Sequence, residues 1–392
     1  MAAAFLIPLH KFALSPVIGL LVLASFWNFK REKFSLVYLT SSLSYFAVLC
    51  IGYLISISKE NALFELEISA AFLIFPVIFS LSNINFKEVL HRLILFFIEG
   101  LVLSILIAFV FSIVKYFHSQ DINSFLYGEI SPFHHTSYMA MFCSFAIAYL
   151  YYNSFNPLKK TYLSPKIQVL IIALLSIYVV LLLSKTGIII TFLIHLISIT
   201  YWIFRLKKVK AGLLIMGIIF TTIILLFSTS QTIRNRFLET YNVITNENEA
   251  ESSTSIRFIT WESSWDIFME NPLIGAGTGD IQYKLSTKFI EKGHNNLAMK
   301  SYNAHNQFLN TASKSGILGL ISILILFGVP IFYSLKLSNP IYIFFFLIVT
   351  INFMTESVLQ TQSGIIFCAF FNSLLFISMI QKSELPTKES TA

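Results

Sequence analysis

Residues 305–319 read HNQFLNTASKSGILG and pass from a polar beginning into an apolar run. His305 and Asn306 are followed by amide and hydroxyl side chains, and the chain is apolar from about residue 315 to residue 335. A run of this length is long enough to cross the hydrocarbon core of a bilayer. The stretch therefore indicates a point where the chain re-enters lipid, with a histidine placed directly before the entry.

Apolar runs of this kind recur along the whole chain. Of the 392 residues, 56% are hydrophobic and only 12% are charged, with a mean hydropathy of +0.75. Soluble globular domains carry about 25% charged residues. The sequence therefore predicts an all-α polytopic membrane protein with about 10–12 transmembrane helices. The predicted spans lie near residues 12–29, 34–57, 66–82, 93–117, 135–152, 167–183, 187–204, 211–228, 315–335, 340–354 and 364–380.

The charged residues between the runs predict how the chain is oriented. Lys and Arg concentrate in alternate short loops and in the C-terminal tail, whereas acidic residues are found in the intervening loops. The positive-inside rule then places the C-terminus in the cytoplasm and the one long loop, about residues 229–314, outside. This topology explains the net charge of +7 without a nucleic-acid partner. The basic residues concerned are Lys30, Arg31, Lys33, Lys87, Arg92, Lys159, Lys160, Lys166, Arg205, Lys207, Lys208, Lys210, Lys336, Lys382 and Lys388.

The first apolar run is not typical of a cleaved signal peptide. Its basic residues follow the apolar segment, whereas a signal peptide carries them in front. We expect this segment to remain as a first span with its N-terminus outside. The cysteines Cys50, Cys143 and Cys368 all lie inside apolar runs, which predicts small buried side chains and no disulfide framework.

The long loop contains a predicted amphipathic helix at residues 255–270, SIRFITWESSWDIFME. Aromatic residues recur at helical spacing on one face and acidic residues on another. Ser255 is the predicted N-cap, and Asn271-Pro272 the predicted stop. The pattern is typical of an interfacial helix that lies on the bilayer with its tryptophans at headgroup level. This placement is compatible with a catalytic role. The aromatic face consists of Trp261, Trp265 and Phe268, and the acidic face consists of Glu262, Asp266 and Glu270.

The segment GAGTGD at residues 275–280 superficially matches a dinucleotide-binding loop. It follows a helix ended by proline, however, whereas the dinucleotide fingerprint follows a strand. We therefore expect a flexible turn.

Two residues of the long loop suit the chemistry of an anionic substrate. With Asn303 as N-cap, His305 would lie in the first turn of a helix, where the helix dipole favours the neutral, proton-accepting imidazole. Arg257 would lie in the first turn of the other helix, where a guanidinium and backbone N–H groups together suit a phosphate. Taken singly, each residue is more often a surface histidine or an interfacial anchor.

Three further features bear on function. Lys185, in SKTG at residues 184–187, is a cation on the outer side, which indicates an anionic partner or a snorkelling side chain. Glu99 lies inside the fourth span and indicates a functional carboxylate or a hydrogen bond between helices. No metal site is predicted, because no zinc spacing is formed by His134, His135, His294 and His305.

Two motifs lie in and directly after the long loop. In the first, His305 and Asn306 are followed by nine residues, Gly316, two residues and Gly319. In the second, Arg257 lies shortly before Trp261 and leads to PLIGAG at 272–277. These motifs resemble those of the O-antigen ligases and related lipid-linked oligosaccharide polymerases of bacterial envelopes. That family has a His followed by Asn, Ser or Gln, nine residues, Gly, two residues and Gly, Thr or Tyr, and an Arg a few residues before a Trp that leads to a Pro-Leu-x-Gly-x-Gly segment.

A third motif is a Ser-Arg-Gly-like element at the outer end of a span. Here it is SKTG, with Lys185 in the place of the Arg, which keeps the charge but lacks the bidentate geometry. The resemblance covers about residues 184–375 and includes TESVLQTQSG at 355–364.

The resemblance implies a GT-C-like, metal-independent and cofactor-free glycosyltransferase of lipopolysaccharide biosynthesis in the bacterial inner membrane. It would transfer a glycan from undecaprenyl diphosphate, with inversion, to a hydroxyl of an acceptor sugar, which in ligases belongs to the lipid A core. His305 would be the base, Arg257 and Lys185 would bind the diphosphate, and Asn306, Trp261, Gly316 and Gly319 would support them. We expect N-terminal transmembrane helices at residues 1–228, a large periplasmic catalytic loop at 229–314, and C-terminal transmembrane helices with a short cytoplasmic tail at 315–392.

Other functions stay open. A polymerase with the same chemistry would use a growing lipid-linked glycan as acceptor, and a related enzyme would glycosylate a protein. A lipid-linked glycan transporter is an alternative of another class, although transporters often contain internal repeats and this chain has none. A membrane scaffold without activity is the last alternative.

Overall fold

All regular structure in the described residues is helical, as the apolar runs predict. The computed structural model describes residues 1–9, 11–27, 35–155, 163–206 and 253–383, with scattered positions between 209 and 238. Its helices are α1 (Ala2–Leu6), α2 (Lys11–Trp27), α3 (Leu36–Ile55), α4 (Lys59–Ser69), α5 (Ala71–Leu81), α6 (Phe86–Ser119), α7 (Thr136–Phe155), α8 (Pro165–Leu181), α9 (Lys185–Leu206), α12 (Ser253–Glu270), α13 (Ile281–Glu291), α14 (Asn295–Met299), α15 (Gln307–Lys336), α16 (Pro340–Thr355) and α17 (Gln362–Ser383).

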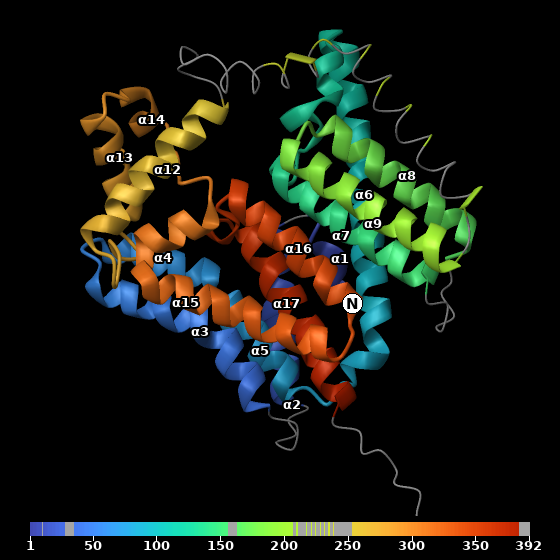
Figure 1. Cartoon of the computed structure of the whole chain (residues 1–392), viewed down its shortest axis with the longest axis horizontal. Helices are drawn as coiled ribbons and strands as arrows, with labels where there is room; N and C mark the ends of the chain where they lie inside the picture. Colours follow the sequence, from blue (N-terminus) through green and yellow to red (C-terminus); the bar gives the residue numbers. More distant parts are fainter. Residues whose placement is uncertain are drawn as a thin grey trace, which may run out of the picture.

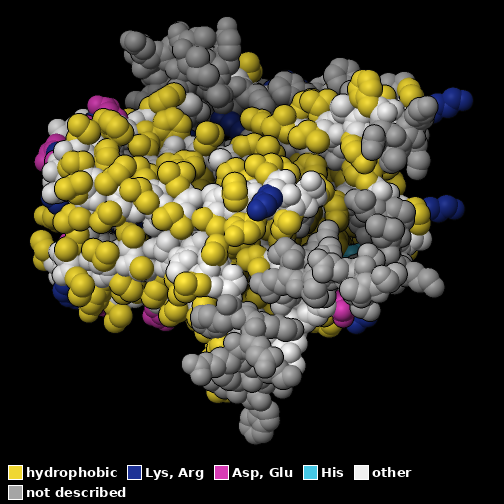
Figure 2. Space-filling model, turned by 60° about the horizontal axis from the view of Figure 1, so that its bottom comes forward, with side chains coloured by type: hydrophobic (Ala, Val, Ile, Leu, Met, Phe, Trp, Pro, Cys, Tyr) yellow, Lys and Arg dark blue, Asp and Glu magenta, His cyan; other side chains and the backbone are white. Residues whose placement is uncertain are grey.

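The helices confirm a polytopic membrane protein. Six stretches of the described chain are long and apolar enough to cross a membrane, namely α3, α4 together with α5, α6, α9, α15 and α17. Shorter apolar helices lie within α2, α8 and α16. Figure 2 shows hydrophobic side chains spread over one face of the bundle, with most charged side chains near its edges. The predicted span at 211–228 lies outside the described ranges.

Helix α17 runs through the middle of the bundle. Its apolar stretch is 94% buried, as expected for a helix that is apolar on every side. Phe367 and Phe371 of α17 meet Phe97 of α6 and Phe145 of α7, with ring centroids 4.7–6.1 Å apart. Edge-on and tilted ring contacts of this kind fix the relative positions of the helices.

Helices α12, α13 and α14 form a layer at one end of the bundle, which we call the α12 end (Figure 1). The acidic face of α12 lies against a basic face of α13. Lys292 pairs with Glu262 at 2.8 Å and with Asp266 at 2.7 Å, and Lys288 pairs with Glu270 at 2.8 Å. These pairs, together with a small cluster around Ile267, Leu285 and Phe289, hold the layer together.

Helix α15 is broken at Gly316, which has φ 62° and ψ −156°. The segment PLIGAG supplies the hydrogen bonds that the break would otherwise leave unmade. The N–H groups of Ala276 and Gly277 donate to the carbonyls of Ser313 and Lys314 at 2.9 and 3.0 Å, and Ile317 N–H donates to Pro272 at 2.8 Å. Irregular backbone at membrane depth requires partners of this kind.

The two halves of α15 fold back on each other at the break. A Cβ atom at Gly319 would lie 2.7 Å from the methyl group of Thr311. A straight helix would separate these residues by about 12 Å along its axis. Gly319 therefore allows close packing of the second half on the first.

The segment GAGTGD contains the predicted turn, but tertiary hydrogen bonds hold it in place and contradict the predicted flexibility. Gly279 N–H donates to Ser56 Oγ at 2.9 Å. The carboxylate of Asp280 accepts hydrogen bonds from the N–H groups of Ile57 at 2.7 Å and Ser58 at 2.8 Å. The segment thus pins the α12 layer to the connection between α3 and α4, a tertiary role that local turn rules do not reveal.

Replacing Gly316 with Ala should lower the apparent Tm of the purified protein. A side chain at this positive φ is strained by about 1–3 kcal/mol, and its Cβ would lie 2.4 Å from the carbonyl carbon of Leu273. Gly328→Ala in the same helix is the matched control, because a Cβ there meets nothing within 4 Å. Thermal unfolding in detergent should separate the two variants; equal Tm values would contradict the role given to Gly316.

Candidate active site

The N-termini of three helices converge on the C-terminus of α16. Ser137, at the start of α7, donates to Glu356 at 3.2 Å. Thr186, at the start of α9, shares a 2.8 Å hydrogen bond with Thr355. The side-chain amide of Asn306, before α15, donates to the carbonyl of Met354 at 3.2 Å. Because the first turns of helices carry partial positive charge, this convergence favours an anion at the α12 end.

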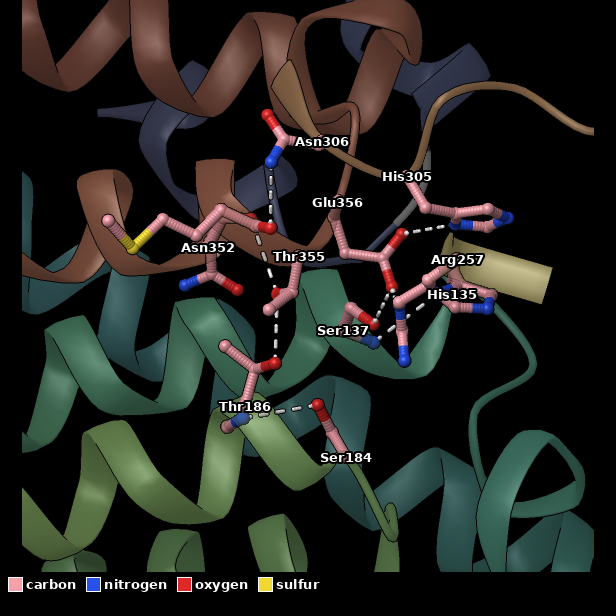
Figure 3. A network of polar contacts seen from close by, with 12 residues as sticks. His135, Ser137, Ser184, Thr186, Arg257, His305, Asn306, Asn352, Thr355 and Glu356 are labelled. Atoms are coloured by element: carbon pink, nitrogen blue, oxygen red, sulfur yellow. Dashed lines mark hydrogen bonds and ion pairs between the residues drawn. The ribbon is translucent and has the colours of Figure 1, made fainter. Parts of the chain in front are cut away.

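Glu356 is the centre of the site, and its side chain is buried. One carboxylate oxygen accepts from Arg257 Nη2 at 3.2 Å, and the other accepts from His305 Nδ1 at 3.3 Å. Figure 3 shows the carboxylate between the imidazole and the guanidinium, with His135 beside Arg257. Glu356 thus joins two residues that are 48 positions apart in the sequence, the predicted base His305 and the predicted phosphate-binding Arg257.

The charges of the cluster keep Glu356 ionised. Burial alone raises the pKa of this carboxyl, but the hydrogen bond from His305 and the charges of His305, Arg257 and His135 lower it more strongly. The net pKa lies below its ordinary value of 4.5. An ionised carboxylate only accepts hydrogen bonds, so His305 carries a proton on Nδ1. When the ring is neutral, its Nε2 is then free to accept a proton.

The backbone around His305 differs from the prediction. Asn303 does not cap the helix; its side chain accepts the N–H of His305 at 2.9 Å. The N-cap is Asn306, which accepts the N–H of Leu309 at 3.1 Å. His305 therefore precedes the helix, in a left-handed conformation with φ 44°. Two asparagines three residues apart can both act as caps, and the tertiary contacts of Asn306 decide between them.

The start of α12 also differs from the prediction. The helix begins at Ser253, so Ser255 lies inside it and Arg257 is in the second turn instead of the first. The predicted end before Asn271-Pro272 is confirmed. Thr260 Oγ1 donates to the carbonyl of Ala304 at 3.3 Å, and Trp261 Nε1 donates to that of His305 at 3.5 Å. Trp261 therefore supports the loop that carries His305.

Lys185 is the first residue of α9 and lies at the same end of the molecule as the cluster. Its neighbour Thr186 bonds Thr355, the residue before Glu356. The hydroxyl of Ser184 accepts the N–H of Gly187 at 3.2 Å and so caps the N-terminus of α9. A cation here adds to the positive ends of the surrounding helices.

Sequence reasoning missed Glu356, His135 and Ser137. Glu356 was visible only as part of TESVLQTQSG. A carboxylate at the end of an apolar span was its available signal, because such a group needs a partner. His135 and Ser137 gave no comparable signal.

The arrangement suits transfer of a group from an anionic leaving group to a hydroxyl. A carboxylate orients a histidine whose far nitrogen is available as a base, as in many hydrolytic and transfer enzymes. Arg257 uses Nη2 for Glu356, while its Nε is buried and has no hydrogen-bond partner among the described residues. Such an unmet donor next to several helix N-termini indicates that an anion completes its bonding.

The fold defines a polytopic membrane protein, and the cluster around Glu356 lies at one end of its helix bundle. Residues 170–324 match the family model described as O-antigen ligase, and over this part of the chain the resemblance to that family is confirmed. The matched part contains Lys185, Arg257 and His305, whereas Glu356 and His135 lie outside it. No curated protein gives a significant match to the chain.

Replacing Glu356 with Gln should weaken the dependence of stability on acid pH. Since the pKa of Glu356 lies below its ordinary value, the carboxylate stabilises the fold above that value, and this stabilisation is lost as the pH falls through the folded-state pKa. Between about pH 5 and pH 3, the Tm of the wild type should therefore fall further than that of the variant.

Glu129→Gln serves as the comparison, because Glu129 pairs with Lys115 at an exposed position. Exposed pairs contribute little to stability, so this variant should follow the wild type. If Glu356→Gln and Glu129→Gln have the same pH profile, the assignment of Glu356 as the paired, ionised centre is wrong.

Proposed function

We propose that the chain is an O-antigen ligase-type glycosyltransferase. It takes a glycan linked to undecaprenyl diphosphate and transfers it to a hydroxyl of the lipid A core at the periplasmic face of the inner membrane. The family match supports glycan transfer of the O-antigen ligase or polymerase type. The observation that carries the proposal further is the buried Glu356 that joins His305 to Arg257.

In the proposed reaction, His305 acts as the general base. Its Nδ1–H is held by Glu356, and Nε2 accepts the proton of the acceptor hydroxyl as the oxygen attacks the anomeric carbon. A bond forms between that oxygen and the anomeric carbon, while the bond from this carbon to the diphosphate oxygen breaks. The electron pair leaves with undecaprenyl diphosphate, and attack from the opposite side inverts the anomeric configuration.

Arg257 and Lys185 would stabilise the charge that develops on the diphosphate. Oriented cations and helix N-termini are most effective where charge grows in the transition state. The Nε–H group of Arg257 is buried and has no hydrogen-bond partner among the described residues, so it is available to bind the diphosphate. Asn306 and Trp261 hold the His305 loop, and Gly316 and Gly319 allow the broken helix that presents it.

The positive-inside pattern supports the proposed placement of the site. It assigns the loops at the α12 end to the periplasm and the C-terminus to the cytoplasm. Both substrates are anchored in the membrane and expose their sugars at that surface. A site formed where helices leave the bundle is therefore within reach of donor and acceptor together.

A polymerase that uses a growing glycan as acceptor would employ the same residues, so the two activities are distinguished by their products. A transporter would require no base. Proteoliposomes that contain labelled lipid-linked glycan, with and without acceptor, separate transfer from transport.

The variant His305→Ala should lose transfer by about 10²–10⁴-fold, the usual contribution of a general base. In a deletion strain complemented with this variant, long glycan should disappear from the lipid A core and accumulate on undecaprenyl diphosphate. Lipopolysaccharide gels and analysis of the lipid-linked pool measure both. Accumulation of single repeats would instead identify a polymerase.

His118→Ala is the matched control, because His118 is an exposed residue in the last turn of α6. It should behave as the wild type. Wild-type glycosylation in the His305→Ala strain would remove His305 from the mechanism.

Substitution of Lys185 tests the diphosphate site separately. Lys185→Ala should raise the KM for the lipid-linked donor by about tenfold, as expected for loss of one charge-assisted contact. Lys185→Arg should retain the wild-type KM or lower it, because a guanidinium can bind phosphate through two donors. Steady-state kinetics with purified donor measure these values; a Lys185→Ala enzyme with unchanged KM would exclude Lys185 from the donor site.

A further inference from the structure

Helix α12 presents three different faces. The first is buried and contains Thr260, Ser263, Ser264 and Ile267. The second is the acidic face paired with α13. The third is apolar, and Phe258, Trp265 and Met269 on it are 54%, 51% and 59% exposed. We call this third face, which consists of Phe258, Trp261, Trp265, Phe268 and Met269, the α12 stripe.

The α12 stripe starts at the candidate active site. Phe258 follows Arg257 directly, and the indole N–H of Trp261 bonds the carbonyl of His305. From Phe258 to Met269 the stripe extends about 16 Å along the helix. Its rings contact one another, with Phe258 and Trp261 at 5.7 Å and Trp265 and Phe268 at 5.3 Å between centroids.

The stripe is continuous with the lipid-facing surface of a membrane span. Leu273 and Ile274, which follow α12, are also exposed. Their segment is hydrogen-bonded to α15 beyond the break, through Ile317 N–H and the carbonyl of Pro272 at 2.8 Å. From there, exposed apolar side chains continue down the second half of α15, including Ile317, Ile321 and Leu324.

Orientation and charge favour contact with lipid. In the view of Figure 1, α12 runs across the direction of α3, as a helix does that lies in the plane of a membrane surface. The stripe contains no charged residue, and the acidic side chains of α12 are paired with lysines of α13. Tryptophan and other aromatic residues prefer the level of the lipid headgroups.

We propose that the α12 stripe is a lipid-binding surface that rests on the outer leaflet, with its rings between headgroups and upper acyl chains. The bilayer is thus the partner of this face. The contact fixes the depth of Arg257 near the level of lipid phosphates, where a diphosphate headgroup also lies. The proposal concerns where α12 sits and does not require that the glycan transfer reaction be correct.

Fluorescence of a single tryptophan tests this placement. The chain has four tryptophans, and the variant Trp27→Phe, Trp202→Phe, Trp261→Phe retains only Trp265. In proteoliposomes, lipids brominated near the headgroup should quench Trp265 by about twofold, and lipids brominated near the chain end should quench it less, as expected for an interfacial ring. Iodide in the aqueous phase should have little effect.

Tyr283→Trp, in a protein whose native tryptophans are all replaced by Phe, is the matched control. Tyr283 is 75% exposed and lies on α13, a different helix from the one that carries the stripe. This residue should be quenched by iodide and not by brominated lipid. If Trp265 behaves like Tyr283→Trp, the stripe faces water; if neither quencher affects Trp265, protein covers the stripe. Either result overturns the proposal, and neither bears on glycan transfer.

Discussion

Burial of the Glu356 carboxylate is the constraint on which the geometry of the site depends. An unpaired carboxylate in a buried position is strongly unfavourable, so its partners must be present in the folded state. These partners come from three distant segments: His305 from the loop before α15, Arg257 from α12 and Ser137 from α7. One buried charge therefore fixes the relative positions of these segments. The helix N-termini around the end of α16 add partial positive charge in the same place. The electrostatic environment of the site therefore favours an anion before any substrate binds.

A second constraint is the backbone of the broken helix α15. In an unbroken helix, Thr311 and Gly319 would lie about 12 Å apart along the axis, so the two halves of α15 could not pack on each other as they do here. Gly316 provides the break. PLIGAG forms hydrogen bonds with the N–H and carbonyl groups on both sides of the break that have no partner within the helix. Gly275 and Gly316 are thus explained by mutual backbone contact: a Cβ at Gly275 would lie 2.4 Å from the carbonyl carbon of Lys314, and a Cβ at Gly316 would lie 2.4 Å from that of Leu273.

Local signals in the sequence predicted the fold class, most spans and the residues His305 and Arg257. Apolar runs report burial in lipid directly, and the helix at 255–270 has a clear period. Glu356, the centre of the site, was not predicted because its contacts with His305 and Arg257 join residues that are 51 and 99 positions apart. The errors at Asn303 and GAGTGD have the same origin. Capping and turn rules identify residues that suit a local conformation, and tertiary partners such as Met354 and Ile57 determine which one is used.

The pairing of α12 with α13 has an electrostatic consequence for the site. Glu262, Asp266 and Glu270 lie on the same helix as Arg257, and their charges would oppose the approach of a diphosphate. Lys288 and Lys292 neutralise this face, and the neighbouring Glu270 and Glu291 raise the pKa of Lys288, which keeps it charged. Arg257 lies between the face that supports the His305 loop and the α12 stripe. A single helix can therefore position a cation for the substrate, carry acidic residues and expose an apolar surface, because α13 removes the one face that would repel the substrate.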